Sequence, residues 1–114
     1  MDTREKIIDA AQAVRIAQDG ALVVKGTFDP LVAPLAARLA SLKQNSRKML
    51  VLIHTPSDAI LPAPARAQLL AALTIVDYVC HEPVSLEPDI DVTHEHARQL
   101  SDLIRHVHER QQAE

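Results

Sequence analysis

Hydrophobic positions alternate along this chain between helical stripes and short unbroken apolar runs. The first stripe predicts a leading helix within residues 1–20. Its apolar positions are Ile7, Ile8, Ala11, Val14 and Ala17. Asp2 followed three residues later by Glu5 has the spacing of a capping box, and Gly20 suits the left-handed end of a helix.

The unbroken apolar runs predict four strands. They cover residues 21–24, 49–53, 75–80 and 90–92. Continuous runs of this kind are typical of strands that are buried on both faces of a parallel sheet.

Helical segments separate these runs. Pro34 and Pro64 suit a first helical turn and predict helices that begin near them, the second running through Leu73. Residues 93–114 predict a C-terminal helix with a frayed tail. Strands alternating with helices indicate an α/β fold, a Rossmann-like three-layer sandwich with a mainly parallel sheet of four or five strands.

Composition narrows the class of protein. The 114 residues predict one domain, 1–114, whose core must be aliphatic because the chain has one Phe, one Tyr and no Trp. The net charge of -3 includes no basic block, so we expect no nucleic-acid partner, although a single nucleotide is compatible with it.

The same composition bears on the cellular compartment. A single cysteine, Cys80, cannot form an internal disulfide and is typical of a reducing compartment. The charged residues 1–6 do not resemble a signal peptide, and no apolar run has the length of a membrane span. We therefore expect a cytoplasmic protein with no membrane partner.

The segment that leaves the first strand is a candidate ligand site, since open parallel sheets bind ligands beyond the carboxyl ends of their strands. Gly26 would let the backbone approach a phosphate closely. Spacing alone favours a plainer interpretation, in which Gly26 turns the chain and Asp29 caps the segment after it.

A resemblance shifts this balance towards a ligand site. Gly26-Thr27-Phe28-Asp29 followed by Leu31 resembles the opening motif of the cytidylyltransferase-like nucleotidyltransferases, Gly-x-Phe-Asp-x-Leu-His-x-Gly-His. Residues 66–79 are similar to the arginine, leucine-rich helix and Val-Asp strand of that family, and Ser57-Asp58 also matches it. The leading helix is most like the ADP-heptose synthase branch, with glycerol-phosphate cytidylyltransferases as further relatives. The resemblance covers residues 4–92 and implies the nucleotidyltransferase-like domain.

The chain departs from this motif at the catalytic positions. Val32 and Leu35 stand where the family has its two histidines, and Pro34 replaces the glycine. In the family the histidines stabilise charge on the triphosphate, which neither an isopropyl nor an isobutyl group can do. The later Ser/Thr-rich signature is also missing. The resemblance thus implies a degenerate, catalytically impaired domain that retains nucleotide or phosphate-ligand binding, with CTP or ATP and magnesium as the implied cofactors.

The implied binding residues occupy the matched positions, and no catalytic residue is assigned. The stronger candidates are Gly26, Thr27, Phe28, Asp29 and Arg66, whose guanidinium suits phosphate. The weaker candidates are Lys25, His54, Asp58 and Asp77. Each charged or histidine side chain has a structural alternative: solvated for Lys25 and Arg66, a loop residue for His54, and a loop or strand end for the two aspartates.

Four further histidines invite a metal hypothesis. They are His94, His96, His106 and His108. Within each pair the spacing is two, which sends the imidazole rings to nearly opposite sides of a helix, so we predict no metal site. Cys80 ends an apolar strand and is predicted to be buried and structural.

Two other functions remain compatible with the sequence. An active nucleotidyltransferase could use His54 and Arg66 in place of the missing histidines. Alternatively, Val32, Pro34 and Leu35 could present an apolar surface to a protein partner. Relatives of the resembled family commonly form homodimers, so a homodimer is also expected.

Overall fold

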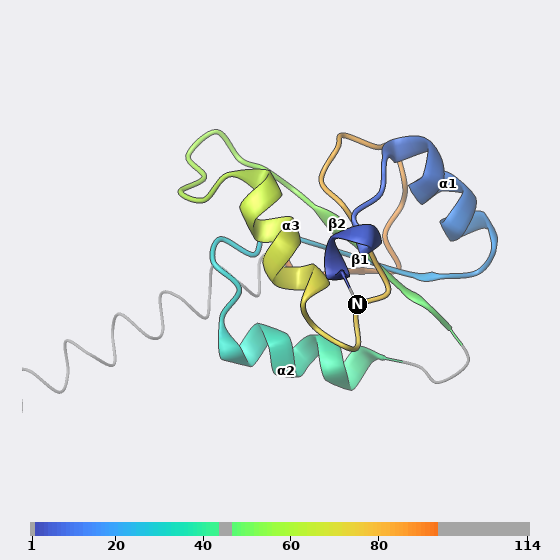
Figure 1. Ribbon diagram of the computed structural model, residues 1–114, viewed down its shortest axis with the longest axis horizontal. Helices are drawn as coiled ribbons and strands as arrows, with labels where there is room; N and C mark the ends of the chain where they lie inside the picture. The colour runs from blue at the N-terminus through green and yellow to red at the C-terminus, as the bar shows by residue number, and fades with distance from the viewer. Residues whose placement is uncertain (1, 44–46, 94–114) are drawn as a thin grey trace, which may run out of the picture.

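A computed structural model describes residues 2–43 and 47–93 of the chain (Figure 1). Within them lies a four-stranded parallel sheet with strand order β3-β2-β1-β4. The strands are β1 (Leu22–Gly26), β2 (Met49–Ile53), β3 (Tyr78–Cys80) and β4 (Ile90–Asp91). The predicted α/β class and parallel sheet are confirmed.

The strand order reverses once along the chain. From β1 the sheet grows through β2 to β3, and β4 then pairs with the free side of β1. β1 and β2 pair along their whole length, with Leu22 opposite Met49 and Gly26 opposite Ile53. The position of the reversal, between the carboxyl ends of β1 and β4, is where sheets of this kind commonly bind ligands.

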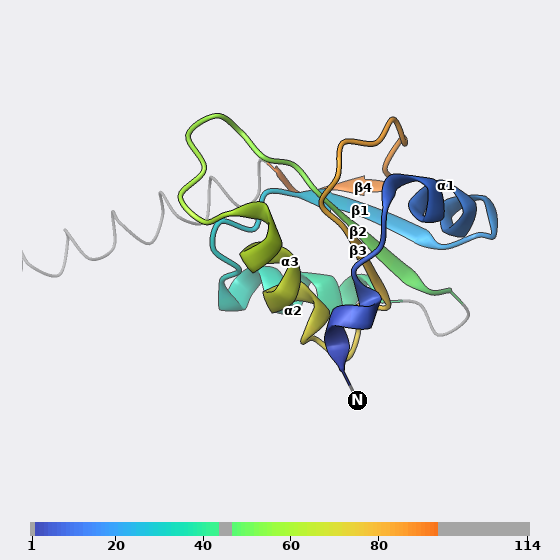
Figure 2. The same ribbon diagram turned by 45° about the horizontal axis from the view of Figure 1, so that its top comes forward.

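Helices lie on both faces of the sheet, as predicted. Figure 2 shows α2 (Ala33–Leu42) and α3 (Ala63–Ala71) on one face and α1 (Ala10–Gln18) on the other. Side chains alternate along a strand, so β2 sends Val51 towards α2 and α3 and Leu52 towards α1, and each face has its own apolar cluster. None of these helices is long and apolar enough to cross a membrane.

The predicted leading helix is wrong at its start. Asp2 caps only a 3-10 turn, Thr3–Lys6, and the capping box lies at Asp9 and Gln12, where α1 begins. Between them Ile7 is extended and bridges Val79, and the amide of Ile8 donates to the carbonyl oxygen of Val79 at 2.9 Å. Ile7 also fits the helical spacing of apolar residues, so the sequence did not indicate its pairing with β3.

The third strand is shorter than predicted, because residues 75–77 do not join it. The amide of Val76 donates to the carbonyl oxygen of Leu73 and forms a turn after α3. The other predicted strands agree with the structure to within two residues at each end. The predicted C-terminal helix lies almost wholly outside the described residues.

Asp77 joins three elements at the amino ends of the strands. Its carboxylate accepts a bond from the Lys43 ammonium, at the end of α2, and from the amide of Met49, which opens β2, at 2.8 Å. Burial tends to raise the pKa of Asp77, but the bonds from Lys43 and Met49 outweigh it and leave this pKa below its ordinary value.

This carboxylate yields the first testable prediction. Asp77→Asn should lower the free energy of unfolding at pH 7 by about 1–3 kcal/mol, since bonds to a charged group are lost. A lowered folded-state pKa stabilises the fold above the unfolded value, about 4, and this contribution disappears as the pH falls through the folded value. Urea denaturation should therefore show the difference from wild type shrinking below about pH 4.

The control is Asp58→Asn, which removes an exposed loop carboxylate. It should stay within about 0.5 kcal/mol of wild type at both pH values. An equal loss in the two variants would contradict a specific role for Asp77.

Candidate functional site

Three chain segments meet at the carboxyl ends of the strands. Residues 27–32 leave β1 for α2, residues 54–62 leave β2 for α3, and residues 81–89 cross from β3 to β4. Most of the candidate residues predicted from the sequence lie here, as expected for a parallel sheet.

Gly26 is required by internal packing. A Cβ atom at this position would lie 2.6 Å from the ring of Phe28 and 2.9 Å from a methyl group of Val92. Phe28 itself has a φ of 51°, in the left-handed region that side chains rarely adopt, and its ring is fully buried. Phe28 and Val92 therefore fill the space beside the end of β1, on the side that faces α2.

Asp29 fastens the loop after β1 to the loop after β2. Its two carboxylate oxygens accept bonds from the amides of Ile60, at 2.6 Å, and Leu61, at 2.7 Å. The side chain is largely buried. Asp29 thus satisfies backbone donors of a neighbouring loop, which is a structural use of the carboxylate.

Arg66 also connects these two loops, but as a donor of hydrogen bonds to their carbonyl oxygens. Its guanidinium is fully buried and donates to the carbonyl oxygens of Thr27, at 2.7 Å, His54, at 3.1 Å, and Leu61, at 3.1 Å. A fourth bond of 2.8 Å reaches the hydroxyl oxygen of Thr55. We call these five residues the Arg66 cluster.

The structure brings Gly26, Thr27, Phe28, Asp29 and Arg66 together at this edge. Their side chains, however, are directed at other groups of the protein: the Phe28 ring at Gly26, the Asp29 carboxylate at two loop amides, and the Arg66 guanidinium at carbonyl oxygens. Arg66 is neither solvated nor exposed, so both of its sequence interpretations miss its buried position. Direct phosphate contact by this group stays a prediction.

Val32 and Leu35, which the resemblance aligns with two histidines, belong to the apolar interior. Leu35 is fully buried in the core between α2 and the sheet, and Val32 is half-buried against the same core. Of the three residues expected to form an apolar surface, only Pro34 is exposed. This removes the main observation behind a protein-interaction surface at this edge.

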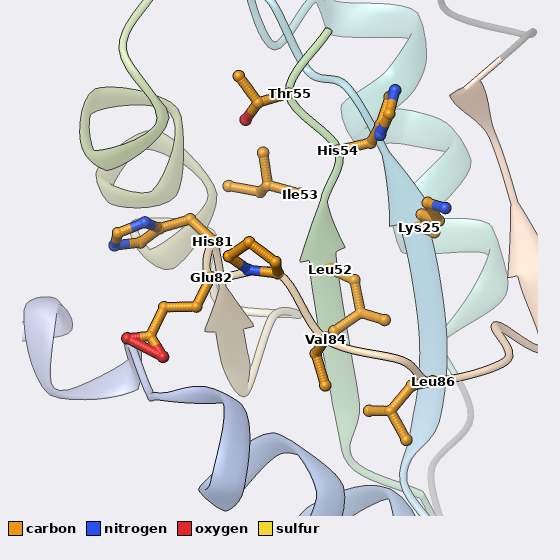
Figure 3. A pocket seen from close by; sticks show the side chains of 10 residues that line it. Lys25, Leu52, Ile53, His54, Thr55, His81, Glu82, Val84 and Leu86 are labelled. Carbon is orange, nitrogen blue, oxygen red and sulfur yellow. The ribbon is translucent and has the colours of Figure 1, made fainter.

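A hollow of about 340 Å³ opens at the carboxyl edge on the face that carries α1. Figure 3 shows Lys25 and His54 on one side of the end of β2, and His81 and Glu82 on the other. Its complete lining is Lys25, Leu52, Ile53, His54, Thr55, His81, Glu82, Pro83, Val84 and Leu86.

The polar lining of this hollow is mainly basic. Lys25, His54 and His81 come from β1 and from the ends of β2 and β3, whereas Glu82 is the one carboxylate among the described lining residues. One oxygen of Glu82 accepts a bond of 3.0 Å from the amide of Ala10, at the start of α1. The start of α1 thus offsets part of the negative charge of Glu82.

The Arg66 cluster reaches this hollow through two of its members. Arg66 holds the backbone of His54 and donates to the hydroxyl oxygen of Thr55. The bond from Arg66 uses Thr55 only as an acceptor, so the hydroxyl proton of Thr55 can still be donated to another group. Arg66 therefore positions two lining residues without lining the hollow itself.

The remaining candidates lie elsewhere. Asp58 is exposed in the loop after β2 and is not part of the lining, and Asp77 is at the opposite edge of the sheet. Among residues 2–43 and 47–93, no three His, Cys, Asp or Glu side chains are grouped closely enough to hold a metal ion. The four histidines His94, His96, His106 and His108 lie outside the described residues.

Cys80 is buried, as predicted, in the apolar cluster beneath α1. Burial raises the pKa of its thiol, and the sulfur lies 3.7 Å from the carbonyl oxygen of Glu82. A thiol with a raised pKa is a poor nucleophile, which supports the structural interpretation.

Sequence reasoning missed His81, Thr55 and the lining residues of segment 81–89. One signal was present: His81 directly follows β3, just as His54 directly follows β2. The carboxyl ends of neighbouring parallel strands meet at one edge, so the same rule applied to both strands would have paired these histidines. No comparable sequence pattern indicated that the aliphatic side chains of Val84 and Leu86 would line the hollow.

The packing of Phe28 against Gly26 gives a second prediction. Gly26→Ala should destabilise the protein by about 1–3 kcal/mol, because the new methyl group overlaps the Phe28 ring. The added cost should be smaller in a Phe28→Leu background, with the remainder due to Val92. Denaturant titration of the four proteins measures this coupling. Equal costs in both backgrounds would contradict the contact.

The Arg66 cluster gives a third prediction. Arg66→Met keeps the length of the side chain but leaves three carbonyl oxygens without this donor, and should cost about 3 kcal/mol or more. Gln68→Met, at an exposed position on the same helix, is the matched control and should be close to neutral. If both variants unfold at the same urea concentration, Arg66 does not hold the loops together.

Comparison with known proteins adds no relative to this description. No protein-family model matches the chain, and a search of curated proteins gives no match. The α/β fold with its parallel sheet rests on the structure alone.

Proposed function

We propose that this chain is a degenerate nucleotidyltransferase-like domain that binds a phosphate-bearing ligand without transferring a nucleotide. The observation that carries the proposal is the hollow lined by Lys25, His54 and His81 at the carboxyl edge of the sheet. Basic groups that converge at this edge of a parallel sheet suit an anionic ligand.

Register supports a shared anion site for Lys25 and His54. Lys25 is paired with Leu52, and His54 lies two residues further along the same chain, so both side chains leave the same face of the sheet. Diagonal neighbours of this kind are within reach of one anion when the side chains are long. Thr55 adds a hydroxyl donor whose oxygen is held by Arg66.

The absence of transfer chemistry is supported by Leu35 and Val32. A fully buried leucine and a half-buried valine cannot stabilise charge on a triphosphate at the two positions where the resembled family uses histidine. The buried guanidinium of Arg66 is likewise directed at backbone carbonyls. Restoring activity through Arg66 would require breaking the contacts between two loops.

Binding is tested by isothermal titration with inorganic phosphate and pyrophosphate. Lys25→Gln and His54→Gln should each weaken binding about tenfold, because the first removes an ammonium group and the second removes an imidazole hydrogen-bonding group. Lys48→Gln, at the opposite edge of the sheet, is the matched control and should bind as wild type does. The melting temperature should rise with ligand concentration in wild type and less in the two site variants.

Two results would overturn the proposal. The first is no heat and no thermal shift at millimolar phosphate or pyrophosphate. The second is pyrophosphate release from CTP or ATP with a phosphorylated acceptor and magnesium, if His54→Gln abolishes it. That result would establish the alternative, an active nucleotidyltransferase that uses altered residues.

A further inference from the structure

The hollow has an aliphatic side as well as a basic one. Leu52 comes from β2, and Val84 and Leu86 from the segment that crosses from β3 to β4. Figure 3 shows this segment passing across β2 and β1, with Val84 near Leu52 and Leu86 farther along, over β1, and both pack against the apolar cluster that contains Leu52. Such a wall can remove a hydrocarbon group from water.

The surroundings disfavour a nucleobase. The described lining contains no Phe, Tyr or Trp, the large aromatic side chains on which a base stacks best, and its only aromatic rings are the imidazoles of His54 and His81. Phe28 and Val92 fill the space beside the end of β1 next to β4, near the strand reversal where such sheets commonly bind nucleotides. The hollow of about 340 Å³ is also near the lower limit of about 300 Å³ for small-molecule pockets.

We propose that the ligand is a compact phosphate monoester with a short aliphatic body, and that nucleotides are not preferred. This inference rests on the proposed function, because it assigns a ligand class to the same hollow. The phosphate lies between Lys25 and His54, within reach of the Thr55 hydroxyl. The aliphatic body extends over Leu52 towards Val84 and Leu86.

A series of alkyl phosphates tests the ligand class directly. Methyl, ethyl, propyl and butyl phosphate should bind wild type with affinity rising by up to about fourfold per added methylene, until the wall is covered. Butyrate, which carries a carboxylate on a propyl group, should bind more weakly than propyl phosphate. CMP and AMP should bind no more tightly than methyl phosphate.

A variant of the wall separates the two parts of the site. Leu86→Ala should flatten the dependence on chain length and leave the affinity for methyl phosphate within about twofold. Ile60→Ala, an aliphatic truncation at a position 83% exposed and outside the lining, should leave the whole series unchanged. Because the series is also measured on wild type, the test does not depend on the folding of either variant.

The outcomes distinguish this inference from the proposed function. Phosphate binding with no dependence on chain length, or tighter binding of CMP or AMP than of butyl phosphate, would overturn the aliphatic ligand and leave phosphate binding intact. Tighter binding of butyrate would replace the phosphate by a carboxylate. Failure of every phosphate, inorganic phosphate included, would overturn both.

Discussion

A buried guanidinium holds the carboxyl edge of this sheet together. Where the loops after β1 and β2 meet, the carbonyl oxygens of Thr27, His54 and Leu61 need donors, because no strand or helix amide among the described residues supplies them. Arg66, on α3, supplies these donors. Asp29, in the loop after β1, makes a second connection by accepting bonds from two amides of the loop that leads into α3. The positions of His54 and Thr55, and with them the rim of the hollow, depend on this exchange.

Most of the fold was predictable because its strands are unbroken apolar runs, a pattern that depends only on burial on both faces. The errors arose where a long-range contact or, in the third strand, the local turn from Leu73 to Val76 overrode the expected spacing. Ile7 lies on a helical stripe but pairs with Val79, and Asp77 follows an apolar run but holds Lys43 and Met49. Neither partner can be identified from nearby residues.

The sequence predicted the location of the candidate site better than it predicted the contacts of its side chains. Carboxyl-edge geometry brought Gly26, Arg66 and His54 to one region, as the sequence indicated. Whether an arginine faces solvent or the interior depends on which carbonyl oxygens surround it, and those belong to distant loops. The motif that resembles a ligand loop thus lies behind the hollow, and Lys25, a weaker candidate, lines it.

The bridge between Ile7 and Val79 has a consequence for the outer border of the sheet. An uncovered border strand presents unpaired amides and carbonyls to which a second chain can add a strand, which is a common route to aggregation. Here the chain's own N-terminal segment takes up part of that position, through the bond from Ile8 to Val79. Ile7 and Ile8, which interrupt the predicted leading helix, therefore hinder the addition of another strand beside β3.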